Sequence, residues 1–236
     1  KKGEPGFQKN VSYNIASHGT HNLSFALSGA DENDDFYVGL ERFQTEGMSA
    51  MTHNDEKDRY RNNSLVANYG HQFSDKIEFQ SNIRIAETYN QYDAEDNTPA
   101  GKTHSEEVDA VESSSNIALI YNNQPILGIV YAPALDLMYT GQIKKGAYKN
   151  GKPIFNRSKR KILIAADSRH NSSKETVAFF NKYNVKKVIR AGSALKLCYL
   201  AEGKIDVYPR FNGTKEWDTA ASHLICNEAG CKIINI

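Results

Sequence analysis

A chain of 236 residues can bury a substantial core, either as one large domain or as two small ones. Its formal net charge of +1 at pH 7 produces no strong electrostatic field, which argues against nucleic acid or an acidic membrane surface as a partner. The chain has no apolar run of about eighteen residues, and its polar opening at residues 1–4 is not of the signal-peptide type. We therefore expect no transmembrane helix and no signal peptide.

Residues 1–112 are polar and consist of short alternating segments. Apolar and polar residues alternate at residues 11–15, 22–28, 36–43, 63–70 and 77–85. Period-two alternation between Asn-, Asp- and Gly-rich turns predicts an antiparallel β-meander with one apolar face. The opposite face is rich in Asn, Gln and Ser, which is typical of a barrel with a wet lumen. We expect a partial barrel, and the alternative is a soluble meander with an exposed polar face.

Two acidic stretches in this part have no strand pattern. Asp31 and Asp34 lie in a candidate cation loop, but the spacing of its carboxylates is not that of a calcium loop and favours a solvated hairpin turn. Residues 90–112 are polar and acidic, and we interpret them as a long loop or linker.

The segments FQTEGMSA at residues 43–50 and YRNNSL at residues 60–65 resemble the early barrel of a TonB-dependent outer-membrane receptor of the cobalamin-transporter type. That family has an N-terminal plug inside a barrel of many strands. The resemblance implies that this chain holds about four to six of those strands, too few to close such a barrel. An open sheet in lipid leaves unsatisfied edge groups, so we do not expect this piece alone to insert into a membrane.

Residues 113–236 have longer apolar runs and predict a layered α/β domain. The predicted strands are residues 116–121, 126–131, the segment within 132–141, the hairpin at 146–154, and residues 161–166, 185–190 and 204–208. The predicted helices are residues 172–183, a segment that follows the turn within residues 191–198 and ends near Gly203, and a segment that begins near Trp217. The three cysteines, Cys198, Cys226 and Cys231, fit no zinc pattern, and we expect reduced core thiols.

A turn into a helix at residues 191–198 is the first candidate for binding chemistry. Free backbone N–H groups at Gly192 and Ser193 form a ready anion site, since Gly192 has no Cβ in the way. Lys196 follows one helical turn later, where its ammonium group can reach the same anion. The alternative is an ordinary strand–helix connection with a surface lysine.

The second candidate is Asp218, in the sequence WDTAA at residues 217–221, which EAG at residues 228–230 continues. A carboxylate in a first helical turn is favoured by the helix dipole, so Asp218 has a purely structural alternative as a helix-start residue. The sequence resembles the C-terminal signature of the magnesium-dependent, lithium-sensitive phosphatases of the inositol monophosphatase family, especially its 3'(2'),5'-bisphosphate nucleotidases.

That resemblance implies the C-terminal half of an inositol-monophosphatase-like sandwich, with Mg²⁺ as cofactor and Asp218 as a metal ligand. It implies that Gly192 and Lys196 contact a substrate phosphate and that Tyr208 and Arg210 flank the nucleotide. A strand-end aromatic and a solvated arginine are the alternatives for the last two. Glu202 is either a substrate contact or a surface residue at a helix end, and His170 is either a phosphate contact or an exposed loop histidine.

The family's other metal ligands come from an N-terminal Glu and an Asp-Pro-x-Asp-Gly-Thr loop, and neither occurs where it is expected. Asp31 and Asp34 have the aspartate spacing of that loop but lack its Pro and Gly-Thr. A single carboxylate rarely holds Mg²⁺ alone. We therefore interpret the chain as a fusion of a receptor-like part, residues 1–112, and an incomplete phosphatase part, residues 113–236.

Three functions remain open at this point. The first is a phosphatase that converts adenosine 3',5'-bisphosphate to AMP and phosphate in the cytoplasm or at the cytoplasmic face of the inner membrane, completed by another chain if it is active. The second is a fragment of an outer-membrane transport receptor, which meets a membrane only if it behaves like its receptor relatives. The third is a non-functional fusion. Unpaired strand edges also predict self-association.

Overall fold

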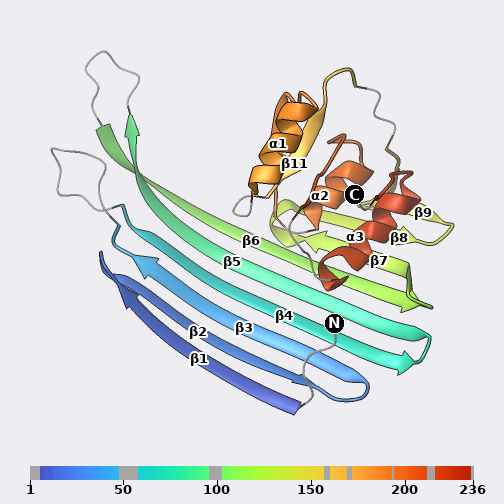
Figure 1. The fold of residues 1–236 in the computed structure, drawn as a ribbon, viewed down its shortest axis with the longest axis horizontal. Helices are drawn as coiled ribbons and strands as arrows, with labels where there is room; N and C mark the ends of the chain where they lie inside the picture. Colours follow the sequence, from blue (N-terminus) through green and yellow to red (C-terminus); the bar gives the residue numbers. More distant parts are fainter. Residues whose placement is uncertain are drawn as a thin grey trace. The chain divides into compact units, whose positions relative to one another are not determined.

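The computed structural model describes residues 6–47, 58–95, 103–156, 160–168, 172–192, 194–211 and 216–234. A ten-stranded sheet, in which strands that follow one another in the chain are neighbours, dominates the described part (Figure 1). Its strands are β1 Gly6–Ala16, β2 Thr20–Ala30, β3 Asp34–Thr45, β4 Tyr60–Ser74, β5 Ile77–Glu95, β6 Thr103–Tyr121, β7 Gln124–Ala132, β8 Leu137–Gln142, β9 Gly146–Lys149 and β10 Lys152–Ile154. The pairs β1–β2 and β2–β3 and the pairs from β6 to β10 are antiparallel.

A second, two-stranded sheet and the helices belong to the C-terminal part of the chain. The strands are β11 Ile164–Asp167 and β12 Lys187–Arg190, which are parallel. The helices are α1 Lys174–Lys182, α2 Leu195–Ala201 and α3 Glu216–Glu228, with a short 3₁₀ helix, η1, at Pro133–Leu135. Ser173 caps α1 by accepting a hydrogen bond from the Thr176 backbone N–H. No helix in the described ranges is long and apolar enough to cross a membrane.

The chain divides into two compact units. The first unit contains residues 68–83 and 114–236, and the second contains residues 2–67 and 84–113. β6 runs without interruption past residue 112. The domain boundary near residue 112 stays a prediction.

The structure confirms the antiparallel meander and most predicted elements of the C-terminal half. All five alternating segments of residues 1–112 lie within β1 to β5. The first predicted hairpin of the C-terminal half turns at Asn122 and Asn123, whose φ angles of 49° and 61° are those of a tight two-residue hairpin turn. The partial barrel stays a prediction.

Asp31 forms a hairpin turn, as the spacing of the acidic residues favours. Its Oδ1 accepts hydrogen bonds from the backbone N–H groups of Asn33, at 2.9 Å, and Asp34, at 2.8 Å. A carboxylate that bonds the backbone two and three residues ahead fixes the turn between β2 and β3. Asp31 therefore has a structural role, and Asp34 begins β3.

Two predictions about local structure were wrong. Residues 90–112 are not a long loop, because β5 extends to Glu95 and β6 begins at Thr103. The polar composition was misleading, since a strand whose backbone is paired tolerates polar side chains. Residues 204–208 form only an isolated parallel bridge between Ala165 and Val207. The amides of Lys204 and Ile205 bond back to the Tyr199 carbonyl, which keeps this segment out of a longer ladder.

The core of the first unit lies where α3 packs on β7, β8 and β9 and against α2. The predicted apolar stripe of α3 is buried, with Leu224, Ile225 and Ala229 at most 5% exposed. Two glycines permit the close approach of helix and sheet. A Cβ on Gly128 would lie 2.6 Å from the Ala221 carbonyl oxygen, and a Cβ on Gly141 would lie 3.0 Å from the Ile225 Cα. The helix thus rests directly on the strand backbones.

The strands β1 to β3 of the second unit have the alternation that the sequence predicts, but many of their apolar side chains are exposed. Phe7, Val11, Tyr13 and Ile15 share one face of β1 and are each more than half exposed. In the register of the sheet Val11 is opposite Phe25, and Phe25 is opposite Leu40 on β3. This face, formed by the odd-numbered residues of β1 and β2 and the even-numbered residues of β3, is called the apolar face of β1–β3 below.

Candidate functional site

The predicted phosphate-binding turn follows β12, in the first unit. β11, β12 and the bridge at Val207 all run parallel, so their carboxyl ends meet at one edge. In open α/β sheets, ligands bind beyond this edge. Gly192 follows β12 there, and Tyr208 follows the bridge. The topology therefore brings residues that are distant in the sequence to one place.

Lys196 is the most informative residue of this edge. It lies in α2 and is only 1% exposed, although it carries a charge. Its Nζ donates a hydrogen bond to the Ala191 carbonyl oxygen at 3.0 Å and lies 5.4 Å from the centroid of the Tyr208 ring. A buried ammonium group is costly unless hydrogen bonds and opposite charge or π-electron density compensate it. The alternative interpretation, in which Lys196 is a surface lysine, is thus wrong.

Tyr208 and Arg210 extend this cluster outward. Arg210 donates a hydrogen bond from Nη1 to the Tyr208 hydroxyl oxygen at 3.1 Å. Lys196, Tyr208 and Arg210 therefore form a chain of contacts that begins beneath the turn at Ala191 and ends at an exposed guanidinium group. The structure thus gathers three of the predicted substrate residues, with Gly192 adjacent through Ala191.

Three other predicted residues cannot be placed in this cluster. Ser193 and His170 lie outside the described residues. Asp218 belongs to the first turn of α3, but its side chain lies outside the described part. Their predicted roles stay predictions.

Glu202 is held by an ion pair at the end of α2. Its Oε2 lies 2.5 Å from Lys149 Nζ, and its side chain is only 12% exposed. The Lys149 Nζ in turn lies 5.7 Å from the centroid of the Tyr139 ring. Burial, with the Glu202 carboxylate as the next cause, raises the pKa of the Tyr139 hydroxyl far above its usual range. In this structure Glu202 therefore joins α2 to β9, and its role as a substrate contact stays a prediction.

Glu228, in the EAG segment, also has a structural partner. Its Oε2 accepts a hydrogen bond from the Gly146 backbone N–H at 2.9 Å. This contact ties the end of α3 to the start of β9. Glu228 of this signature therefore stabilises the packing of α3 against the sheet.

The three cysteines are free thiols, as predicted. Burial raises the pKa of the Cys198 thiol above its usual range. Cys231 is half-buried, and the neighbouring Cys226 thiol lowers its pKa. Cys226 also donates from Sγ to the Leu197 carbonyl oxygen at 3.0 Å, so these thiols stabilise the contact of α2 with α3.

Asp167 is a residue of this edge that sequence reasoning missed. It ends β11, is 6% exposed and accepts a hydrogen bond from the Ser168 backbone N–H at 2.7 Å through Oδ1. The Ala191 backbone N–H donates to the Asp167 carbonyl oxygen at 3.3 Å, next to the Gly192 turn. A carboxylate directly after an apolar strand was the signal that could have identified it.

The described residues do not form a complete magnesium site. Across the described ranges, no group of three or more His, Cys, Asp and Glu side chains converges as a metal site requires. Magnesium needs several oxygen ligands in octahedral geometry.

A comparison with known families identifies the class of protein. The inositol monophosphatase family matches residues 112–236, more than half of the chain, and the chain belongs to this family. The C-terminal part of the fold prediction is thereby supported. The family match begins at residue 112, so the receptor interpretation of residues 1–112 gains no support from it and stays a prediction.

Bisphosphate nucleotidases are among the relatives that the chain matches. The chain is 38% identical over 125 residues to the 3'(2'),5'-bisphosphate nucleotidase CysQ of Escherichia coli K12, a match that covers 52% of this chain and 50% of that protein. It is 34% identical over 125 residues to inositol monophosphatase 3 of Solanum lycopersicum, which covers 49% and 47% of the two chains. The crystal structure of CysQ from Bacteroides thetaiotaomicron aligns with a TM-score of 0.47 at 34% identity, over 50% of this chain and 52% of that one. The chain spans about half the length of the curated relatives it matches.

Proposed function

We propose that residues 112–236 form the substrate-binding half of a phosphatase site for nucleotide 3',5'-bisphosphates. The observation that carries this proposal is the buried Lys196 ammonium group beside the Gly192 turn. The match to proteins named 3'(2'),5'-bisphosphate nucleotidase supports the choice of substrate. This function belongs in the cytoplasm or at the cytoplasmic face of the inner membrane, where the phosphatase interpretation expects it.

Each residue of the edge has a role in this proposal. The Gly192 and Ser193 backbone N–H groups and the Lys196 charge bind one phosphate. Tyr208 offers an aromatic face to the nucleotide, and Arg210 pairs with a second phosphate. His170 and Glu202 are proposed as further substrate contacts, on the family resemblance. Asp218 is proposed as one magnesium ligand, on the family resemblance.

Binding tests the proposal directly. We expect the chain to bind adenosine 3',5'-bisphosphate in calorimetry, and Lys196→Met and Arg210→Gln to weaken that binding by about tenfold or more, as the loss of a charged contact does. Lys187→Met is a matched control, because Lys187 is exposed on β12. Since Lys196 is buried, circular dichroism must first show that its variant is folded. Unchanged binding by both Arg210→Gln and a folded Lys196→Met variant would refute the site.

Hydrolysis is a separate question from binding. We expect the chain to hydrolyse adenosine 3',5'-bisphosphate very poorly or not at all in the presence of Mg²⁺, because further acidic ligands are missing from the family's expected loop. A magnesium-dependent, lithium-inhibited turnover that disappears in Asp218→Asn would show instead that the site is complete. Magnesium titration by calorimetry, with and without nucleotide, distinguishes the two outcomes.

A further inference from the structure

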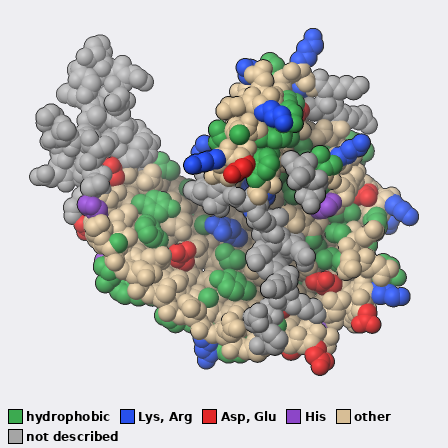
Figure 2. Space-filling model, viewed as in Figure 1, with side chains coloured by type: hydrophobic (Ala, Val, Ile, Leu, Met, Phe, Trp, Pro, Cys, Tyr) green, Lys and Arg blue, Asp and Glu red, His purple; other side chains and the backbone are tan. Residues whose placement is uncertain are grey.

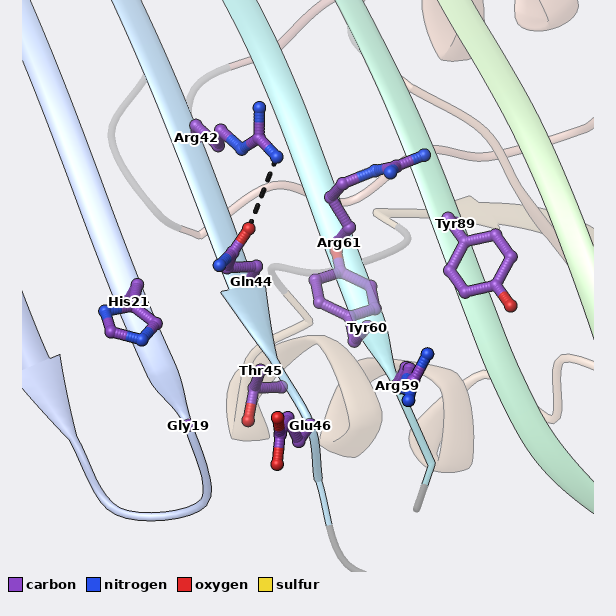
Figure 3. Close-up of a pocket in the computed structure, with 10 residues that line it drawn as sticks. All are labelled: Gly19, His21, Arg42, Gln44, Thr45, Glu46, Arg59, Tyr60, Arg61 and Tyr89. Atoms are coloured by element: carbon purple, nitrogen blue, oxygen red, sulfur yellow. Dashed lines mark hydrogen bonds between the residues drawn. The ribbon is translucent and has the colours of Figure 1, made fainter. Parts of the chain in front are cut away.

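The second unit contains a cavity of about 390 Å³ at one end of its strands. Figure 3 shows that the lining side chains come from neighbouring strands, with Arg61 of β4 reaching toward Tyr89 of β5. The cavity is lined by Gly19, His21, Arg42, Gln44, Thr45, Glu46, Arg59, Tyr60, Arg61 and Tyr89. None of these residues takes part in the phosphatase proposal.

The lining of this cavity is cationic. It contains three guanidinium groups, from Arg42, Arg59 and Arg61, and a single carboxylate, from Glu46. Arg42 donates from Nη2 to Gln44 Oε1 at 3.3 Å, and the Arg61 guanidinium lies 5.6 Å from the centroid of the Tyr89 ring. Both of these partners are uncharged, so the positive charge is retained. Guanidinium groups bind phosphate by paired hydrogen bonds, which makes the cavity suited to an anionic group.

The register of the sheet connects this cavity to the apolar face of β1–β3. Arg42 is opposite Leu23, and Leu23 is opposite Tyr13. Residues that are opposite one another in a sheet project from the same face. The next row on that face, two residues further along each strand, consists of Val11, Phe25 and Leu40. The cationic cavity therefore borders directly on rows of apolar side chains.

Four of the five apolar side chains in these rows are open to solvent, and Phe25 is partly buried. Val11 is 67% exposed, Tyr13 57%, Leu23 48% and Leu40 45%. Single exposed apolar residues are common, but contiguous rows of them mark a binding surface. In the view that Figure 2 gives of the molecule, hydrophobic, basic and acidic side chains are interspersed. The strand register, and not this view, shows that the arginine side chains lie next to the apolar rows.

We propose that the cavity and the adjoining apolar rows bind an anionic amphiphile with a phosphate head group and an apolar tail. The guanidinium groups of Arg42, Arg59 and Arg61 hold the phosphate, and the rows of Leu23 and Leu40 cover the tail. A ligand that is an anion without an apolar tail would leave the apolar rows exposed to water. A ligand with an apolar tail but no negative charge would give the guanidinium groups no anion to bind. Removing apolar area from water is favourable, so the tail adds affinity beyond that of the phosphate.

Calorimetry with monomeric probes tests this proposal on the intact chain. The probe is dihexanoylphosphatidic acid below its micelle-forming concentration, compared with inorganic phosphate and with dihexanoylphosphatidylcholine. We expect dihexanoylphosphatidic acid to bind at least about tenfold more tightly than either comparison ligand. Equal binding of inorganic phosphate would overturn the role of the apolar rows, and equal binding of the zwitterionic phosphatidylcholine would overturn the requirement for a net anionic head group.

Variants separate the two parts of the surface. Arg42→Gln with Arg61→Gln is expected to weaken both phosphate and phosphatidic acid binding by about tenfold, as the loss of charged hydrogen bonds does. Leu23→Ser with Leu40→Ser is expected to weaken only phosphatidic acid binding. Arg84→Gln is the matched control, an exposed arginine of β5 outside the cavity. A loss of the same size in Arg84→Gln would refute a specific site.

Self-association is the competing explanation for the apolar rows. Sedimentation velocity of the wild type and of the Leu23→Ser, Leu40→Ser variant distinguishes it. A monomer in both cases supports the amphiphile proposal. A dimer that the serine substitutions dissociate, with no phosphatidic acid binding, would mean that a second copy of the chain covers these rows.

Discussion

Valine and tyrosine have opposite environments in the two units of this chain, although both occur on antiparallel strands. Val130 of β7 and Tyr139 of β8, in the first unit, are completely buried. Val11 and Tyr13 of β1, in the second unit, are 67% and 57% exposed. β7 has the continuous apolar run of a strand that is covered, whereas β1 alternates, and the alternation of β1 does not by itself bury its apolar face.

The difference arises from the helices. In the first unit α3 lies directly on β7 and β8, because Gly128 and Gly141 leave room for its backbone. Fully burying an apolar side chain stabilises a protein by about 1.5–3 kcal/mol. The strands β1 to β3 gain little from this source. Their described stabilising contacts are the backbone ladder and cross-strand pairs such as Ser12 with Ser24.

Amide hydrogen exchange should show the largest difference between the two units. β8 is paired on both sides, with β7 and β9, and β2 is paired on both sides, with β1 and β3. We expect the amides of β8 to exchange about 100-fold more slowly than those of β2, because opening β8 must also expose a helix-covered core. Equal protection of the two strands would mean that the second unit has a covered face as well.

The substitution Gly128→Ala should destabilise the first unit by about 1–3 kcal/mol, since the new Cβ meets backbone atoms that can separate only if α3 moves. Thermal unfolding monitored by circular dichroism measures this. Gly39→Ala in β3 is the control, because its Cβ would contact the flexible Tyr37 side chain. A similar loss at Gly39 would indicate a general cost of replacing strand glycines.

The substitution Val130→Ala should lower the free energy of unfolding by about 2 kcal/mol, because buried methyl groups are lost and a cavity remains. Val11→Ala replaces an exposed valine and should change the free energy of unfolding by less than about 0.5 kcal/mol. Urea unfolding of both variants gives the comparison. If Val11→Ala were as costly as Val130→Ala, the apolar face of β1–β3 would be covered in solution.

The smallest expected effect concerns the turn between β2 and β3. Asp31→Ala removes the acceptor of two backbone hydrogen bonds and should destabilise the second unit by about 0.5–1.5 kcal/mol. Asp31→Asn keeps an acceptor oxygen and should recover most of that loss. Identical stability of all three proteins would show that the turn forms without this side chain.

The C-terminal elements and the candidate edge were largely predictable because local signals agreed with the final structure. The Ser cap and first-turn Glu175 indicated α1, and the apolar stripe indicated the buried face of α3. Lys196 was identified from its distance to Gly192 in the sequence. Its contact with Tyr208 was not predictable, since the two are twelve positions apart in the sequence and only the parallel bridge at Val207 brings them together.

The sequence by itself determined the strand periodicity, the turn at Asp31, the helices of the C-terminal half and the family of residues 112–236. These depend on neighbours within a few residues or on a recognisable signature. Only the tertiary structure decided which apolar faces are covered, that Glu202 pairs with Lys149, and that Arg42 and Leu23 share a face with Val11 and Leu40. Contacts of this kind depend on register and on helix placement, which arise from many weak interactions between residues that are far apart in the chain.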